Sequence, residues 1–207
     1  STLDRSSAAS DVYKRQKVHR GQCLFSDDGL ELEYEDLVET IEEFGKQLSS
    51  IEKENNKICA LVLPNGVDMA ISFLALANYV TVSPLNPNYT KEEFLFFLED
   101  LNCEFIITDN NVSNSLLEAA KQLKIKLFYL NNYSPKNRLS IKSLSAPSKC
   151  LLDQNKADDI CLILHTSGTT SRPKQVQLSC VNIISSALNI ARVLQLDKED
   201  KGMNIMP

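Results

Sequence analysis

From about residue 22 onward, apolar positions fall into two alternating patterns. One consists of short apolar runs that end at turn residues, which is typical of strands buried on both faces of a parallel sheet. The run Ile58–Leu63 ends in this way at Pro64-Asn65-Gly66. A hairpin with a turn at Asp27-Asp28-Gly29 is expected first. Buried strands are then expected over residues 58–63, 80–84, 104–108, 125–130 and 160–164.

The other pattern places apolar residues at helical spacing between those runs. In the first such segment, five apolar residues separated by steps of four and three fall on one helical face. They are Leu37, Ile41, Phe44, Leu48 and Ile51. Further along, Thr90 and Glu93 have the spacing of a capping box, so Thr90 is expected to cap a helix. Other helices are expected over residues 67–78, 113–123 and 181–194, the last of them amphipathic.

This alternation of strands and helices predicts an α/β fold. Each crossover is long enough to return the next strand parallel to the last, so a right-handed, doubly wound, mostly parallel sheet is expected. Surface loops are expected over residues 131–157 and between residue 164 and the helix at 181. Residues 1–16 are polar, lack periodicity and resemble a non-native leader, so we expect them to be disordered and leave them out of the fold.

Composition narrows the classes of function. The chain has 207 residues, and 22 Lys and Arg against 27 Asp and Glu give a formal net charge of −5. This acidic balance argues against a nucleic-acid surface, and no apolar run approaches the roughly 20 residues of a membrane-spanning helix. The six cysteines form no CxxC pair, as is typical of reduced, buried thiols in an intracellular protein; a disulfide framework is the alternative. No metal site is expected.

Candidate chemistry lies in a hydroxyl-rich loop, residues 166–174, which follows the last buried strand. Five of its first six residues carry hydroxyl groups, and the sixth is Gly168, which allows close backbone approach. Lys174 and Arg172 add positive charge, so the loop is suited to a polyphosphate. It is not a Walker A loop, because Pro173 and Gln175 flank the lysine. A plain surface turn is the alternative.

The sequence LHTSGTTSRPK at 164–174 resembles the phosphate-binding signature of the adenylate-forming (AMP-binding) superfamily. This superfamily includes acyl-CoA synthetases, luciferases and the adenylation domains of peptide synthetases. Residues 83–94 resemble a second segment of these enzymes, with a proline, an asparagine and the start of a helix. Ser171, together with EEFxFFLxD at 92–100, is most similar to the oxalate–CoA ligase branch.

The resemblance implies an acyl-CoA synthetase that uses ATP, Mg²⁺ and coenzyme A and acts on oxalate or another small carboxylic acid. The acid attacks the α-phosphorus of ATP, which releases diphosphate and leaves an acyl-adenylate that coenzyme A captures as a thioester. The residues implied to contact the β- and γ-phosphates are Thr166, Ser167, Gly168, Thr169, Thr170 and Lys174. No catalytic residue and no metal ligand is expected within this chain.

Two departures from the family pattern affect this interpretation. The family usually has glycine where this chain has Gln175, and a side chain there is expected to restrict the loop and protrude into it. The chain also ends before the family's downstream motifs. Residues 17–207 are therefore expected to be the N-terminal part of an AMP-binding domain, without the C-terminal domain, and to make no thioester alone. The expected compartment is cytoplasmic or peroxisomal.

Several alternatives stay open at this point. The chain could be a non-catalytic nucleotide-binding module, a poorly folding truncation product, or part of an enzyme that passes its acyl group to a carrier protein or to oxygen. His165 could be a general base, but no carboxylate accompanies it within the motif, which favours a packed histidine. The Glu-rich stretch 31–43 could hold a metal, but its helical spacing favours a solvated face.

Overall fold

The computed structural model of this chain describes residues 21–26, 29–51, 58–131, 139–142, 154–166, 173–197 and 199–203. Residues 1–16 lie outside these ranges. The first described element is the expected hairpin, in which β1 (Gln22–Phe25) pairs antiparallel with β2 (Glu31–Glu33). No helix among the described residues is long and apolar enough to cross a membrane.

The remaining described strands form one sheet in the order β7-β6-β5-β3-β4-β8-β9. Its five inner strands run parallel, and the two edge strands, β7 and β9, are antiparallel to their neighbours. All five predicted buried strands form, so the doubly wound, mostly parallel sheet is confirmed. The strands are β3 (Ile58–Val62), β4 (Thr81–Pro84), β5 (Phe105–Thr108), β6 (Lys126–Asn131), β7 (Ser140–Ile141), β8 (Ile160–Thr166) and β9 (Lys174–Ser179).

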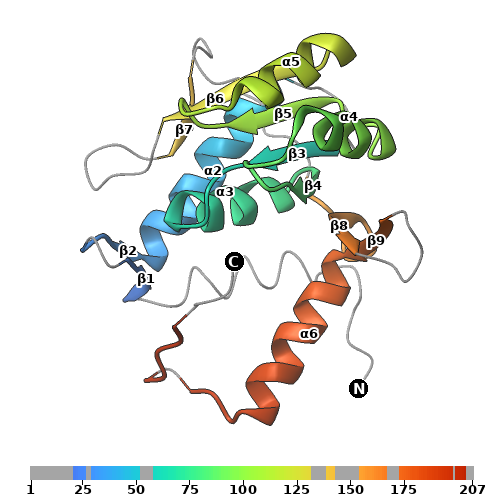
Figure 1. Cartoon of the computed structure of the whole chain (residues 1–207). Helices are drawn as coiled ribbons and strands as arrows, with labels where there is room; N and C mark the ends of the chain where they lie inside the picture. Colours follow the sequence, from blue (N-terminus) through green and yellow to red (C-terminus); the bar gives the residue numbers. More distant parts are fainter. Residues whose placement is uncertain are drawn as a thin grey trace.

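Helices cover both faces of this sheet (Figure 1). Because successive side chains of a strand point to opposite faces, β3 contributes to two apolar cores. Cys59 and Leu61 lie in a core with α2 and α3, whereas Ala60 and Val62 lie in a second core with α4 and α5. The helices are α2 (Tyr34–Ile51), α3 (Val67–Ala77), α4 (Lys91–Asp100) and α5 (Asn114–Leu123).

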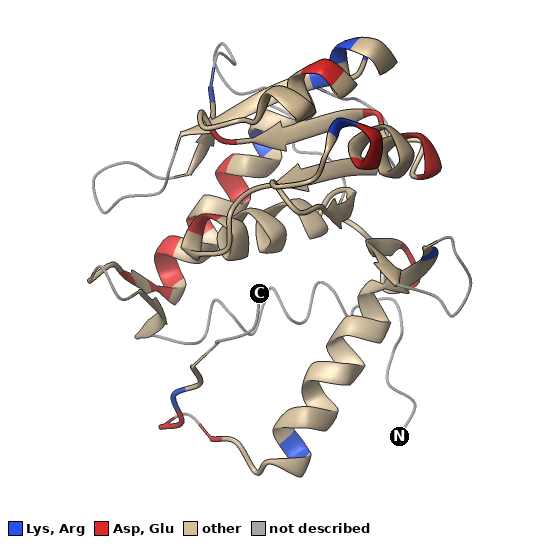
Figure 2. Ribbon diagram, in the orientation of Figure 1, with Lys and Arg blue, Asp and Glu red and all other residues tan. Residues whose placement is uncertain are grey.

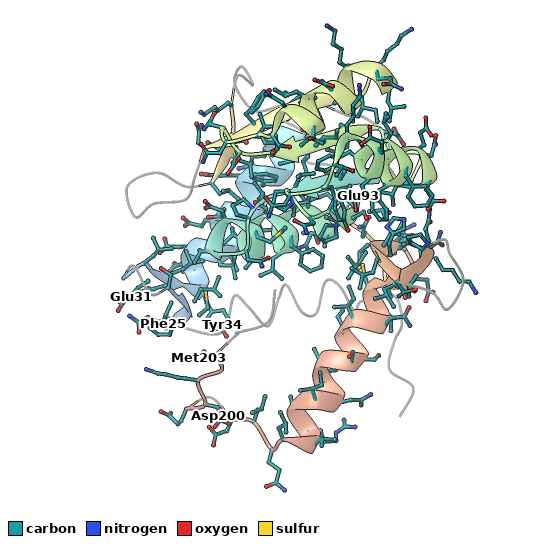
Figure 3. The ribbon with its side chains drawn as sticks, in the orientation of Figure 1. Phe25, Glu31, Tyr34, Glu93, Asp200 and Met203 are labelled. Atoms are coloured by element: carbon teal, nitrogen blue, oxygen red, sulfur yellow. The ribbon has the colours of Figure 1, made fainter. Side chains whose placement is uncertain are left out.

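The start of α4 has the predicted capping box. The Thr90 hydroxyl accepts a hydrogen bond from the backbone N–H of Glu93 at 3.2 Å, and the Glu93 carboxylate accepts one from the backbone N–H of Thr90 at 2.8 Å. Two backbone donors that the helix leaves unpaired are thereby satisfied. Glu93 is labelled in Figure 3 in the first turn of this helix. Thr90 therefore fixes where the chain turns from the sheet into α4.

Two edge strands lie where the sequence predicts loops. β9 occupies residues 174–179, within a predicted polar loop, and β7 lies within the predicted loop 131–157. Val176 and Leu178 alternate with polar residues in β9, which is the pattern of a half-exposed edge strand and not of a buried one. The apolar-run criterion used for the inner strands misses such a segment because so few of its side chains are buried.

The last helix, α6 (Cys180–Val193), also follows the sequence prediction, and Ser179 caps it. Its apolar face is not covered by the described residues: Leu188 is 50% exposed and Leu194 is 63% exposed. Figure 1 shows that α6 extends away from the layered part of the molecule, and Figure 2 shows a helix almost free of charge. Five of the six cysteines are described, all as free thiols and all but Cys23 buried. Cys150 lies outside the described residues.

Candidate functional site

The hydroxyl-rich loop begins at the carboxyl end of a parallel strand. β8 ends at Thr166, and its parallel neighbour β4 ends at Pro84, so the segments that follow these two strands leave the sheet at the same side, the side of the carboxyl ends. In open α/β sheets, ligands bind in the crevice outside these carboxyl ends. The fold therefore presents the loop where such a sheet binds small molecules.

Thr166 and Lys174, the first and last of the six predicted phosphate contacts, lie opposite each other. They form the terminal pair of the antiparallel β8–β9 ladder, and the Thr166 hydroxyl donates to the Lys174 carbonyl at 3.4 Å. Both residues are exposed. The other four, Ser167, Gly168, Thr169 and Thr170, lie outside the described residues. The structure thus brings together the two ends of the loop, and contact with phosphate stays a prediction.

Two hydroxyl groups of β4 fix the position of β8. The backbone pairing of these strands is short, with Val82 opposite Leu162. On either side of it, Thr81 Oγ1 donates to the Ile160 carbonyl at 2.6 Å, and Ser83 Oγ donates to the Ile163 carbonyl at 3.0 Å. Ser83 belongs to the second segment on which the family resemblance rests. Its side chain therefore positions the strand that enters the loop.

His165 is packed, as the sequence favours, but it does have a carboxylate partner. Its side chain is 7% exposed and meets the Phe97 ring edge-on, with ring centroids 4.7 Å apart. Its Nε2 lies 3.0 Å from Oδ2 of Asp100, the last residue of α4. Sequence reasoning missed Asp100 because it precedes His165 by 65 residues. The family-like pattern EEFxFFLxD at residues 92–100 ends at Asp100, and it was the sequence signal that could have pointed to this aspartate.

The expectation that Gln175 protrudes into the loop is wrong. Its side chain turns toward the end of α4, where Nε2 donates to the main-chain oxygen of Asp100 at 2.6 Å and to Oδ2 at 2.8 Å. The reason is its register: Gln175 pairs with His165 in the antiparallel ladder, so both side chains project toward Asp100. The Gln175 amide, with a smaller contribution from His165, holds the pKa of the Asp100 carboxyl below its usual value.

Aromatic contacts connect this cluster to the segment that precedes α4. The Tyr89 ring stacks on Phe97, with centroids 4.9 Å apart and planes inclined by 19°. Phe97 in turn contacts His165. Tyr89 comes from the second family-like segment and His165 from the first. The two segments on which the resemblance rests therefore meet through one phenylalanine.

Within the described residues, no group of three or more His, Cys, Asp or Glu side chains is arranged to hold a metal ion. In the Glu-rich stretch 31–43, the glutamates at 31, 33 and 35 are exposed and those at 39, 42 and 43 are partly buried; acidic residues recur along α2 (Figure 2). We assign no Mg²⁺ ligand to these residues.

Curated relatives of this chain include CoA ligases. The chain is 37% identical over 156 residues to a protein named oxalate–CoA ligase from Arabidopsis thaliana, a match covering 72% of this chain and 30% of the relative. A protein of the same name from Saccharomyces cerevisiae is 32% identical over 173 residues, covering 72% of this chain and 32% of the relative. The chain therefore spans about a third of the length of these relatives.

Solved structures share the fold. Apo MatB from Rhodopseudomonas palustris matches with a TM-score of 0.77 and 20% identity, covering 94% of this chain and 38% of that one. O-succinylbenzoate coenzyme A synthetase from Bacillus subtilis, in complex with AMP, matches with a TM-score of 0.74 and 21% identity, covering 91% and 47%. The model of the AMP-binding enzyme family matches residues 12–207. The chain thus belongs to the AMP-binding enzyme family.

Proposed function

We propose that this chain is the ATP-phosphate-binding part of an AMP-forming acid–thiol ligase. In the proposed reaction, a carboxylate oxygen attacks the α-phosphorus of ATP, the bond to the bridging oxygen breaks, and diphosphate leaves. The resulting acyl-adenylate then reacts with the thiol of coenzyme A, which releases AMP and gives the thioester. The chain spans about a third of its curated relatives, so the complete reaction is proposed for a protein of their length.

The pairing of Thr166 with Lys174 at the carboxyl edge of the sheet carries this proposal. It closes the two ends of a loop whose four remaining predicted contacts carry three hydroxyl groups and one glycine. A carboxylate that attacks a polyphosphate meets like-charge repulsion, so donors and a cation beside the departing diphosphate lower the barrier. Lys174 is exposed at that place and supplies the cation.

Oxalate is the acid that we propose first, because relatives from a plant and from yeast carry the name oxalate–CoA ligase. The co-substrates would be ATP, with its Mg²⁺, and coenzyme A. In a protein that carries this chain at the length of its relatives, diphosphate release with oxalate is compared with release with malonate and acetate. Faster release with either of these acids would assign a different small carboxylic acid.

ATP binding by this chain tests the central part of the proposal. Calorimetric titration with MgATP is compared between wild type, Lys174→Ala and Lys126→Ala. Lys126 is the matched control. It is exposed at the amino end of the parallel strand β6, and therefore lies away from the carboxyl ends at which the loop begins. Loss of a charged hydrogen bond to phosphate is expected to weaken binding about tenfold or more in Lys174→Ala alone.

AMP serves as the second ligand in the same titration. If Lys174 contacts the β- and γ-phosphates, Lys174→Ala should weaken ATP binding much more than AMP binding. Equal weakening for both nucleotides, or unchanged ATP binding in Lys174→Ala, would contradict the proposed role of the loop.

A further inference from the structure

Asp100, His165 and Gln175 form one hydrogen-bonded cluster where the β8–β9 hairpin meets the end of α4. His165 and Gln175 are an antiparallel pair, next to the Thr166–Lys174 pair at which the loop begins and ends. Asp100 accepts hydrogen bonds from both side chains. We call this cluster the Asp100 brace. It connects both strands of the hairpin to a single helix end.

The Gln175 amide satisfies two acceptors that the helix itself leaves unpaired. The main-chain oxygen of Asp100 is among the last carbonyls of α4, which have no partner within a helix. The Asp100 carboxylate also lies at the negative end of the helix dipole, where it needs donors. One side-chain amide donates to both atoms, at 2.6 and 2.8 Å. A glycine at this position would have no side chain that could do so.

The Asp100 brace lies next to the two residues at which the loop begins and ends. A loop that binds polyphosphate through several donors binds more tightly when those donors are held in place before the ligand arrives. The loop is attached to the sheet through the last residues of β8 and the first residues of β9. His165 and Gln175 stand at those positions, and Phe97 packs against His165 from the side.

We propose that Gln175 is a positioning residue for the hydroxyl-rich loop: through Asp100 it fixes the β8–β9 hairpin against α4 and so raises the affinity of the loop for ATP. This inference rests on the proposed function, because it names the residue that organises the same site. The hydrogen bonds of the brace can be tested without nucleotide.

The experiment compares Gln175→Gly and Gln175→Ala with wild type and with Gln177→Ala. Gln177 is the matched control, because it is an exposed glutamine two residues further along the same strand and so projects from the same face. Amide hydrogen exchange over β8 and β9 is measured first, without ATP and at a temperature at which all variants are folded. Exchange is expected to be about threefold to tenfold faster in both Gln175 variants, the effect of losing one or two hydrogen bonds, and unchanged in Gln177→Ala.

ATP affinity of the same variants is measured next by calorimetry, and is expected to fall by a similar factor in the Gln175 variants alone. A residue that contributes only to overall stability would raise amide exchange evenly over the whole sheet and leave ATP affinity unchanged. If wild type binds no ATP, the proposed function fails, while the exchange data still decide whether the brace exists. If wild type binds ATP and the Gln175 variants bind it equally well, the positioning role is overturned and the proposed function stands.

Swapping the amide and carboxylate groups of Gln175 and Asp100 tests the contact directly. Gln175→Glu places an acceptor against the Asp100 carboxylate, so faster amide hydrogen exchange over β8 and β9 and weaker ATP binding are expected. Adding Asp100→Asn restores a donor opposite the introduced carboxylate and should recover part of both losses. If the double variant is no better than Gln175→Glu, the contact between these two side chains is not what positions the loop.

Discussion

Gly45 of α2 lies directly against the ring of Tyr79, which precedes β4. A Cβ atom at position 45 would lie 2.6 Å from Oη and 2.7 Å from Cε2 of that ring. Tyr79 is 1% exposed and belongs to the apolar core between the sheet and α2, so its ring could shift only by displacing buried neighbours. The absence of a side chain at residue 45 is therefore what allows α2 to approach the sheet.

Gly45→Ala is expected to destabilise the chain, although alanine favours helices. The helix propensity of alanine gains up to about 1 kcal/mol over glycine. Overpacking a buried ring costs about 1–3 kcal/mol, so the net change is a loss. Urea unfolding followed by circular dichroism measures it. Tyr79→Leu supplies the control background: there the loss caused by Gly45→Ala should shrink or change sign, and an undiminished loss would contradict the steric explanation.

Ser72→Ala, a second replacement by alanine within a helix, is expected to stabilise the chain. Ser72 lies in α3 with its side chain fully buried, and its Oγ has no hydrogen-bond partner among the described residues. An unsatisfied buried hydroxyl costs about 1–3 kcal/mol, so its removal should raise the free energy of unfolding by about 1 kcal/mol or more. Ser49→Ala is the control, since the Ser49 hydroxyl donates to the Lys46 carbonyl at 2.8 Å. Equal gains in both variants would show that helix propensity alone is responsible.

The sequence predicts most of the strands and helices because their signals are local. An inner strand such as Ile58–Val62 is apolar on both faces, and a helix start such as Thr90 with Glu93 carries its partners within four residues. Both signals lie close together along the chain and depend on burial or local hydrogen bonding. β9 is less evident because an edge strand buries few of its side chains, so only Val176 and Leu178 of its residues are apolar.

The candidate site is predictable only where its residues are adjacent in sequence. The motif at 164–174 predicts a phosphate loop, and the structure places its two ends together. The partner of His165 is not predictable from the motif, because the fold brings Asp100 to it from a distant helix. For the same reason the sequence alone misplaces the Gln175 side chain in the loop, since the acceptors that hold it elsewhere belong to α4.

Ser83→Ala is expected to loosen β8 from β4. It removes a buried hydrogen bond beside a short backbone ladder, so a loss of about 1 kcal/mol is expected, with faster amide exchange concentrated in β8. Ser140→Ala, on the edge strand β7, is the control: it removes an exposed hydrogen bond that the Ser140 hydroxyl accepts from Asn131 of β6, and it should change stability by less than about 0.5 kcal/mol. If exchange rises evenly over the whole sheet, Ser83 does not act specifically on β8.

Asp100 should make stability depend on pH in a defined direction. The Gln175 amide first, and His165 second, hold the folded-state pKa of this carboxyl below its ordinary value of 3.8. A lowered folded-state pKa means that the stabilisation is complete above the unfolded-state value and is lost as pH falls through the folded-state value. Asp100→Asn should therefore be less stable than wild type at pH 5 and above, and the difference should narrow as pH falls below 3.8. The side chain is 38% exposed, so the difference should stay below about 1 kcal/mol.

Urea unfolding between about pH 2.5 and pH 6 measures this difference in stability, with Glu99→Gln, at the adjacent exposed carboxylate, as the control. A difference between wild type and Asp100→Asn that is constant over this range would mean that the charge on Asp100 does not stabilise the folded chain.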